Sequence, residues 1–438
     1  MENVCNTCRI LNGMDYEASY RYSVFFPPEL NFSGLLTTPE RPWNVGGTGQ
    51  ACALLVRALA QRGDTEIILQ VDQPLDYAID VPNVTARLIQ PAAAKWLQYL
   101  FRIVNHFIKQ DDLQDKSNRA FLYLARSMGS HAKRSNFQYR GDQAIFFSST
   151  VLPPNFISHI KDQHIPLVLW NVSDSLTDGG ALNSTIWQKG YDRCIETADI
   201  VVVQNATQQQ DVLKFHHRDS IIMMPGIVAP LANGLEEERS DCALGAQPEL
   251  LWIGRCNGMK RPWALLPLAH ALPEYKIKVI MAQKNDDDFD RTIRYDLAHC
   301  PNVTLIDGMP HEEIMALYHQ DIIMINTSAR EGLPNTFIEA ASAQRPFVSL
   351  ESPLGGILDE SLHDNSLGLC AKGDIDLMVQ QVRTLASNPQ IRLHIGQAAN
   401  RYVYEHLNAD KIASEWISFI ETLSQDFKVT EKMTSENQ

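Results

Sequence analysis

The sequence predicts an α/β protein with two doubly wound domains that face each other across a cleft. In both halves, short apolar segments of strand length alternate with helical segments, which is the pattern of βαβ units around a parallel sheet. The alternation is interrupted between 229 and 247, where Glu, Ala and Gly predominate. A chain of 438 residues is also too long for one ordinary core. We therefore expect two domains, with the linker between them in that stretch.

Apolar runs bounded by turn residues define the expected strands. A helix over 51–62 follows a glycine-rich turn at Gly46 and Gly47, and helices dominate from Ile375 onwards. The expected strands are 22–26, 67–71, 85–89, 144–147, 166–170, 200–203 and 221–224, then 250–253, 277–281, 303–306, 322–325 and 346–350. The predicted organisation is a first domain over 1–228, a linker over 229–248, a second domain over 249–408, a C-terminal helix over 409–425 and a disordered tail over 426–438.

Composition and charge restrict the class of protein. Hydrophobic residues make up 45% and charged residues 21% of the chain, as in soluble globular proteins. The formal net charge of -14 argues against general binding to nucleic acid or anionic lipid. No basic segment followed by an apolar run opens the chain, and no apolar stretch reaches about 18 residues. An apolar stripe over 96–108 is typical of a core helix, and weak peripheral membrane association is the alternative.

The cysteines suggest a reducing compartment. The eight cysteines are scattered, and only Cys5 and Cys8 form a C-x-x-C pair. Zinc would need a second such pair or a nearby histidine pair, so we expect no metal site. We read the thiols as reduced and expect a cytoplasmic protein.

A strand, a tight turn and a helix N-terminus are expected around Glu331. The run 322–325 ends in a polar loop with Gly332 and Pro334, and a helix restarts near Thr336. Backbone N–H groups and the positive end of the helix dipole would suit a phosphate there. Glu331 and Glu339 would instead accept hydrogen bonds from hydroxyl groups, so the ligand would carry phosphate and polyol together. The alternative for Glu339 is a capping box with Thr336.

A second loop with cations follows the run 250–253. Gly254 is expected to turn the chain sharply at the end of that strand, and Arg255 and Lys260 then place two positive charges beside it. Arg can bind phosphate in a bidentate manner, while Lys acts as a point charge. Because ligands of doubly wound sheets lie at the carboxyl ends of the strands, both loops are expected at one site.

These motifs resemble the donor-binding half of retaining GT-B glycosyltransferases of the "group 1" class, known as family 4. The resemblance covers about residues 249–410 and is looser in the first half of the chain. It implies a GT-B fold with two Rossmann-like domains, of which the first binds the acceptor and the second the nucleotide-sugar donor. In the second half, the resemblance rests on Gly254, Arg255, Lys260, the E-x7-E pair Glu331 and Glu339, and on Gly355, Gly356 and Gly368. In the first half, it rests on Gly46, Gly47 and the segments 198–203 and 224–226.

The resemblance implies a role for each residue. Arg255 and Lys260 would neutralise the donor diphosphate and stabilise the leaving group, and Glu331 would contact the sugar hydroxyls, so these three are the expected catalytic residues. No metal or other cofactor is implied, because the two cations and the helix N-terminus supply the positive charge. The implied donor-binding residues are Gly46, Gly47, Gly254, Gly332, Leu333, Pro334, Asn335 and Glu339.

The chain departs from the family pattern on the acceptor side. The family usually has a His-Asp or His-Glu pair after the strand that matches 166–170. This chain has the segment 171–174 there, without a histidine, so Asn171 and Asp174 become the acceptor-side candidates. Gln344 stands where the family usually has a small residue, and Ala282 follows a strand after which the family usually has a glycine. The expected partners are a nucleotide-sugar donor and a glycan, lipid-linked or other hydroxyl acceptor. The alternatives are a nucleotide-sugar epimerase or hydrolase, or a non-catalytic nucleotide-sugar binding protein, on the same fold.

Overall fold

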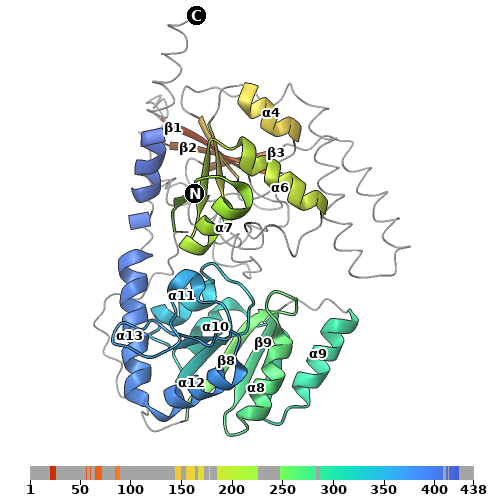
Figure 1. Cartoon of the computed structure of the whole chain (residues 1–438), viewed down its shortest axis with the longest axis vertical. Coiled ribbons are helices and arrows are strands. Elements are labelled where there is room, and N and C mark those ends of the chain that lie inside the picture. Colours follow the sequence, from red (N-terminus) through yellow and green to blue (C-terminus); the bar gives the residue numbers. More distant parts are fainter. Residues whose placement is uncertain are drawn as a thin grey trace, which may run out of the picture.

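The computed structural model confirms an α/β architecture with two parallel sheets, one in each half of the chain (Figure 1). The structure describes residues 20–25, 56, 60, 65–71, 84–88, 144–148, 154–162, 166–171, 177, 185–224, 247–282, 287–407, 411–412 and 414–423. Within these ranges, no helix is both long enough and apolar enough to cross a lipid bilayer.

The first sheet has seven strands in the order β3-β2-β1-β4-β5-β6-β7, and every pair is parallel. Its strand Leu167–Trp170 is apolar and fully buried, and Ile200–Val203 is buried except at its first residue, as expected where helices cover a parallel sheet. The strands are β1 (Tyr20–Phe25), β2 (Thr65–Val71), β3 (Val84–Leu88), β4 (Ala144–Ser148), β5 (Leu167–Trp170), β6 (Ile200–Val203) and β7 (Ile221–Ile222), and the helices described with them are α4 (Pro154–Asp162), α6 (Thr185–Thr197) and α7 (Ala206–His216).

The second sheet has six strands in the order β10-β9-β8-β11-β12-β13, again all parallel. The strand order reverses between β8 and β11, the place where ligands of doubly wound sheets bind. The strands are β8 (Glu249–Arg255), β9 (Ile277–Ala282), β10 (Val303–Ile306), β11 (Ile322–Asn326), β12 (Phe347–Ser349) and β13 (Leu369–Cys370), with η3 (Pro262–Ala264), α8 (Leu265–Ala271), α9 (Asp288–Ala298), α10 (His311–Tyr318), α11 (Asn335–Ser342), η4 (Leu354–Gly356), α12 (Ile375–Ser387) and α13 (Pro389–His406).

The C-terminal helical residues connect the two halves. After α13, which packs against α11, residues 411–412 and 414–423 are again helical and run alongside the first half (Figure 1). Trp416 is fully buried there and meets Trp170 of β5 edge to face, with ring centroids 5.2 Å apart. Its indole Nε1 donates to the carbonyl oxygen of Met224 at 3.4 Å. Residues from both sheets thus share one hydrophobic cluster.

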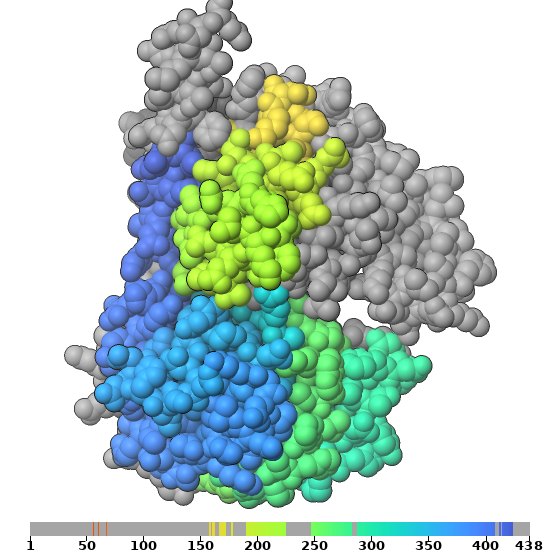
Figure 2. Space-filling view, viewed as in Figure 1, coloured from red at the N-terminus to blue at the C-terminus, as the bar shows by residue number. Residues whose placement is uncertain are grey.

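Helix α7 also contacts the second half. In the space-filling view, the yellow-green surface that contains α7 lies directly against the cyan surface of the second half (Figure 2). Gly355 of η4 packs so closely on Asn205, the N-cap residue of α7, that a Cβ at Gly355 would lie 2.7 Å from the Asn205 Cβ. Gly355 has φ of 71°, so glycine suits both its backbone conformation and this close approach.

The expected strands are confirmed, with ends that shift by a few residues. The sequence patterns did not predict β13, which is only two residues long. Val56 and Ala60, in the helix expected over 51–62, are helical and buried. Most of the linker expected over 229–248, the stripe over 96–108 and the tail over 426–438 lie outside the described residues, so these assignments and the domain boundaries stay predictions.

Candidate functional site

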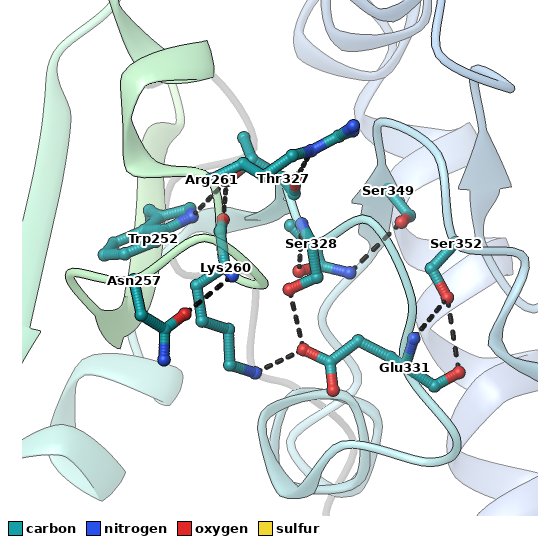
Figure 3. Close-up of polar contacts among 10 residues, drawn as sticks. Trp252, Asn257, Lys260, Arg261, Thr327, Ser328, Glu331, Ser349 and Ser352 are labelled. Carbon is teal, nitrogen blue, oxygen red and sulfur yellow. Dashed lines mark hydrogen bonds and ion pairs between the residues drawn. The ribbon is translucent and has the colours of Figure 1, made fainter. Parts of the chain in front are cut away.

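Lys260 and Glu331 form an ion pair at the reversal point of the second sheet (Figure 3). Lys260 lies in the loop after β8, and Glu331 lies in the loop between β11 and α11. The exposed fractions of the two side chains are 24% and 13%, so the pair is partly buried and still reachable from solvent. Ser328 Oγ donates to the same carboxylate oxygen of Glu331 at 2.6 Å. The structure thus brings two of the three expected catalytic residues into contact.

The backbone of Glu331 is also held in place. Its N–H donates to Ser352 Oγ at 2.9 Å, and that hydroxyl donates back to the Glu331 carbonyl oxygen at 3.3 Å (Figure 3). Ser352 follows β12 and is almost fully buried. The carboxylate is therefore fixed from both its side chain and its backbone, by residues that follow neighbouring strands.

The Lys260 loop is tied to the Glu331 loop by several hydrogen bonds. The Ala329 N–H donates to the Met259 carbonyl oxygen at 2.9 Å, and Arg261 Nε donates to the Thr327 carbonyl oxygen at 3.0 Å. Asn257 Oδ1 accepts from the Lys260 N–H at 2.9 Å, which closes the turn between β8 and η3 (Figure 3). The two loops therefore form one unit.

Gly254 does not turn the chain, so that expectation was wrong. Strand β8 continues through Gly254 to Arg255. A Cβ at Gly254 would lie 2.8 Å from Cη2 of Trp252, because the Trp252 indole lies over the backbone two residues further along the same face. Glycine is needed here for the close approach of a large aromatic ring.

Arg255 lies at the end of β8 with its side chain exposed. Among the described residues, its guanidinium makes no ion pair or hydrogen bond. The neighbouring Cys256 is buried. Burial is the largest cause that raises the pKa of its thiol to about 12, and the hydrogen bond with Asp290 is the second. This thiol stays protonated at neutral pH. The cations of the loop are Arg255, Lys260 and Arg261, of which Arg261 pairs with Glu351.

Glu339 does not cap its helix, so the capping alternative is wrong. Helix α11 begins at Asn335 with Pro334 as its N-cap, and the N-terminal turn has no side-chain cap. Thr336 therefore lies inside the first turn, and Glu339 lies a full turn from the helix start. The Glu339 carboxylate instead pairs with His311 Nε2 at 2.9 Å and accepts from Tyr318 OH at 3.1 Å.

The start of α11 contains four more of the residues that were expected to bind the donor. Gly332 and Pro334 are half-buried, Leu333 is buried in the core, and Asn335 is the first helical residue. Because the first N–H groups of a helix have no partner within it, this end of α11 remains available to an anion or a hydroxyl group.

The acceptor-side candidates are less well defined. Asn171 is buried at the end of β5, and its N–H donates to the Val202 carbonyl oxygen at 2.7 Å. Asp174 lies outside the described residues, as do Gly46 and Gly47, which were expected to bind the donor. The first half reaches the site through Asp211 of α7, whose Oδ2 lies 2.5 Å from Nη2 of Arg330, the residue before Glu331.

Several residues around the site were missed by the sequence analysis. They are His311 and Tyr318 beside Glu339, Thr327 and Ser352 between the loops, and the pair Asp211 and Arg330. A hydroxyl-rich run, Asn326-Thr327-Ser328, was the one available signal.

The structure also adds buried Arg294, which joins the ends of two strands. It donates to Asp307 Oδ1 at 2.6 Å and to the Met281 carbonyl oxygen at 3.2 Å.

No metal site is evident in the part of the chain that the structure describes, because no three His, Cys, Asp or Glu side chains converge there. Positive charge at the site comes from Arg255, Lys260 and Arg261 of the loop after β8. Two parallel doubly wound sheets, with charged loops at the reversal point of the second, define the GT-B class of fold.

Comparison with known proteins agrees with this class. Residues 236–402 match the family model described as "Glycosyl transferases group 1". Sucrose-phosphate synthase from Thermosynechococcus elongatus is similar in structure, with a TM-score of 0.66, 14% identity, and coverage of 92% of this chain and 99% of that chain. HepE of Anabaena in complex with UDP-glucose is similar at a TM-score of 0.59 and 14% identity, over 92% of this chain and 99% of HepE. A search of curated proteins gave no match.

A third similar structure comes from E. coli and is described as trehalose-6-phosphate bound with UDP-2-fluoro glucose. Its TM-score is 0.60 at 11% identity, over 91% of this chain and 98% of that chain. All three share little sequence with this chain, so what they establish is the fold. The GT-B prediction is confirmed.

Proposed function

We propose that the protein is a retaining, metal-independent glycosyltransferase of family 4 that moves a sugar from a nucleotide-sugar donor to a glycan, lipid-linked or other hydroxyl acceptor. The observation that carries this proposal is the Lys260–Glu331 ion pair at the reversal point of the second sheet. In this pair, a cation that would bind the diphosphate lies beside a carboxylate that would bind sugar hydroxyls, in the segment that matches group 1 glycosyl transferases.

The chemistry follows from the charges. Breaking a glycosidic bond to a nucleoside diphosphate leaves negative charge on the diphosphate, and cations already in place lower the barrier. The Lys260 ammonium has three N–H donors, so it can keep its contact with Glu331 and still bind a phosphate oxygen. Arg255, exposed at the end of β8, would add a second cation.

On the other side of the site, Glu331 and Glu339 would bind hydroxyl groups. Carboxylates accept hydrogen bonds from sugar hydroxyls, and Glu331 has been placed by Ser328 and Ser352 before any donor arrives. Glu339 lies in the second turn of α11. The ribose is attached to the diphosphate and would bind there. UDP-sugars are the first donors to test, because HepE and the E. coli structure were solved with UDP-sugars.

The test is to incubate the protein with UDP-, GDP- and ADP-sugars and to follow nucleoside diphosphate release with and without acceptors. Release that depends on an acceptor, with the product in the same anomeric configuration as the donor, supports the proposal. Equal release without an acceptor would indicate a hydrolase, isomerised donor would indicate an epimerase, and binding without turnover would indicate a non-catalytic protein. Activity lost in EDTA and restored by a divalent metal would contradict metal independence.

Two variants locate the site within this assay. Lys260→Ala and Arg255→Ala should each lower turnover by about 10²–10³, the usual effect of removing one charge-stabilising donor. The matched control is Lys278→Ala, which removes another half-buried ion-paired lysine of the same sheet, bonded to Glu249. Full activity in both site variants would place the reaction elsewhere.

A further inference from the structure

Two consecutive hydroxyl side chains at the end of β11 each hold one member of the Lys260–Glu331 pair. Thr327 Oγ1 donates to the Lys260 carbonyl oxygen at 2.7 Å, and Ser328 Oγ donates to Glu331 Oε1 at 2.6 Å (Figure 3). Both residues are fully buried. The two loops thus converge on adjacent residues of one strand end.

The Thr327 hydroxyl has two partners, which use it in opposite ways. Trp252 Nε1 donates to Thr327 Oγ1 at 2.9 Å, and an indole N–H can only donate (Figure 3). The single hydrogen of the hydroxyl is therefore left for the Lys260 carbonyl oxygen. The indole is itself buried, and the absence of a side chain at Gly254 gives it room.

We propose that Thr327 and Ser328 form a two-hydroxyl clamp that positions Lys260 and Glu331 for the donor. This inference rests on the proposed function, since it assigns both residues to a nucleotide-sugar site. Thr327 acts through Lys260, so its effect falls on the diphosphate. Ser328 acts through Glu331, so its effect falls on the sugar. Neither residue needs to contact the donor.

The two halves of the clamp predict different binding patterns. Thr327→Val keeps the shape and removes the hydroxyl, so it should weaken the nucleoside diphosphate and the nucleotide-sugar alike, by about tenfold for the loss of one buried hydrogen-bonded group. Ser328→Ala should weaken the nucleotide-sugar by about tenfold and leave the nucleoside diphosphate within about twofold. Thr327→Ser keeps the hydroxyl and should restore most of the affinity.

Calorimetric titration with UDP, GDP and ADP, and then with the sugar conjugate of the tightest binder, tests this pattern. The control is Asn400→Ala, which removes a partly buried hydrogen bond to the Ser342 carbonyl oxygen in the same half of the chain, away from both loops. This control should lower the melting temperature and leave both affinities unchanged. Ser328→Ala removes a single oxygen atom and carries the test if Thr327→Val does not fold.

The outcomes separate the clamp from the proposed function. If the wild type binds none of the three nucleoside diphosphates, the proposed function fails, and the clamp fails with it. If the wild type binds one of them while Thr327→Val and Ser328→Ala keep both affinities, as Asn400→Ala does, the clamp is wrong and the proposed function stands. An equal loss of both ligands in Ser328→Ala would also contradict the assignment of Ser328 to the sugar.

Discussion

His311 Nε2 lies 2.9 Å from Glu339 Oε1, so the first residue of α10 is bonded to a carboxylate one turn inside α11. The hydrogen bond that the imidazole donates to the Glu339 carboxylate is the largest cause of a raised pKa at His311, although partial burial of the ring opposes it. Charge on Glu339 and Glu312 acts in the same direction as the hydrogen bond. Folding therefore favours the protonated imidazole.

This raised pKa predicts a pH-dependent contribution to stability. A group whose pKa is higher in the folded state stabilises the protein fully below its unfolded pKa, about 6.5 for histidine, and loses that effect as the pH rises through the folded value. The free energy of unfolding of His311→Gln should therefore be lower than that of the wild type near pH 6, by about 1 kcal/mol for a partly exposed pair. The difference should shrink towards pH 9.

Urea unfolding at a series of pH values from 6 to 9 measures this difference. His319→Gln is the comparison variant, because His319 is exposed at the other end of the same helix. A difference between His311→Gln and the wild type that is the same at every pH would mean that the ion pair contributes nothing.

A second prediction concerns Glu339 as a ribose ligand. Glu339→Gln keeps the shape of the side chain but removes its charge, so hydrogen bonds from ribose hydroxyls should weaken. Charge-assisted hydrogen bonds contribute about 1.5–3 kcal/mol, so the affinity for UDP should fall by roughly tenfold or more. The same titration with 2′,3′-dideoxy-UDP should show a much smaller difference between variant and wild type. An equal loss for both nucleotides would assign Glu339 a structural role only.

The parts of this site that depend on local pattern were predictable. Apolar runs bounded by turn residues identified β8 and β11. The polar loops that follow these two runs contain Lys260 and Glu331, which made both residues candidates. The rule that ligands lie at the carboxyl ends of parallel strands then placed both residues in one site, although they are 71 positions apart. The structure agrees because the meeting of loops at the carboxyl ends of parallel strands depends on the topology of the sheet and not on side-chain contacts.

Other parts depended on tertiary contacts that no local pattern encodes. Thr336 and Glu339 fit the spacing of a capping box, yet Pro334 provides the N-cap and the carbonyl that accepts from Phe337 and Ile338. The helix therefore starts before Thr336, and Glu339 is left to pair with His311. The partners of Glu339 come from α10, and a single sequence gives no reason to choose that helix.

A third prediction tests the link between α7 and the Glu331 loop. Arg330 and Asp211 are partly buried, and their ion pair holds the residue before Glu331 against the first half of the chain. Asp211→Arg and Arg330→Asp should each reduce kcat/KM by about tenfold, because like charges then face each other and displace the loop. The double variant restores opposite charges and should recover part of the loss.

A double-mutant cycle on kcat/KM measures this coupling. Losses that simply add in the double variant would mean that the two side chains act independently. A parallel reversal of the exposed pair Arg291 and Asp288 on α9 provides the control, since a surface pair of this kind should leave kcat/KM unchanged.

The last prediction concerns Trp416, which attaches the C-terminal helical residues to the first sheet. Trp416→Ala would remove a fully buried ring that packs on Trp170 and would also remove the hydrogen bond to Met224. Replacement of a buried aromatic residue by alanine typically costs about 3–5 kcal/mol, so the midpoint of urea unfolding should fall markedly. Trp416→Phe keeps an aromatic ring without the indole N–H and should cost much less. Equal stability of wild type and Trp416→Ala would show that this packing does not hold the two halves together.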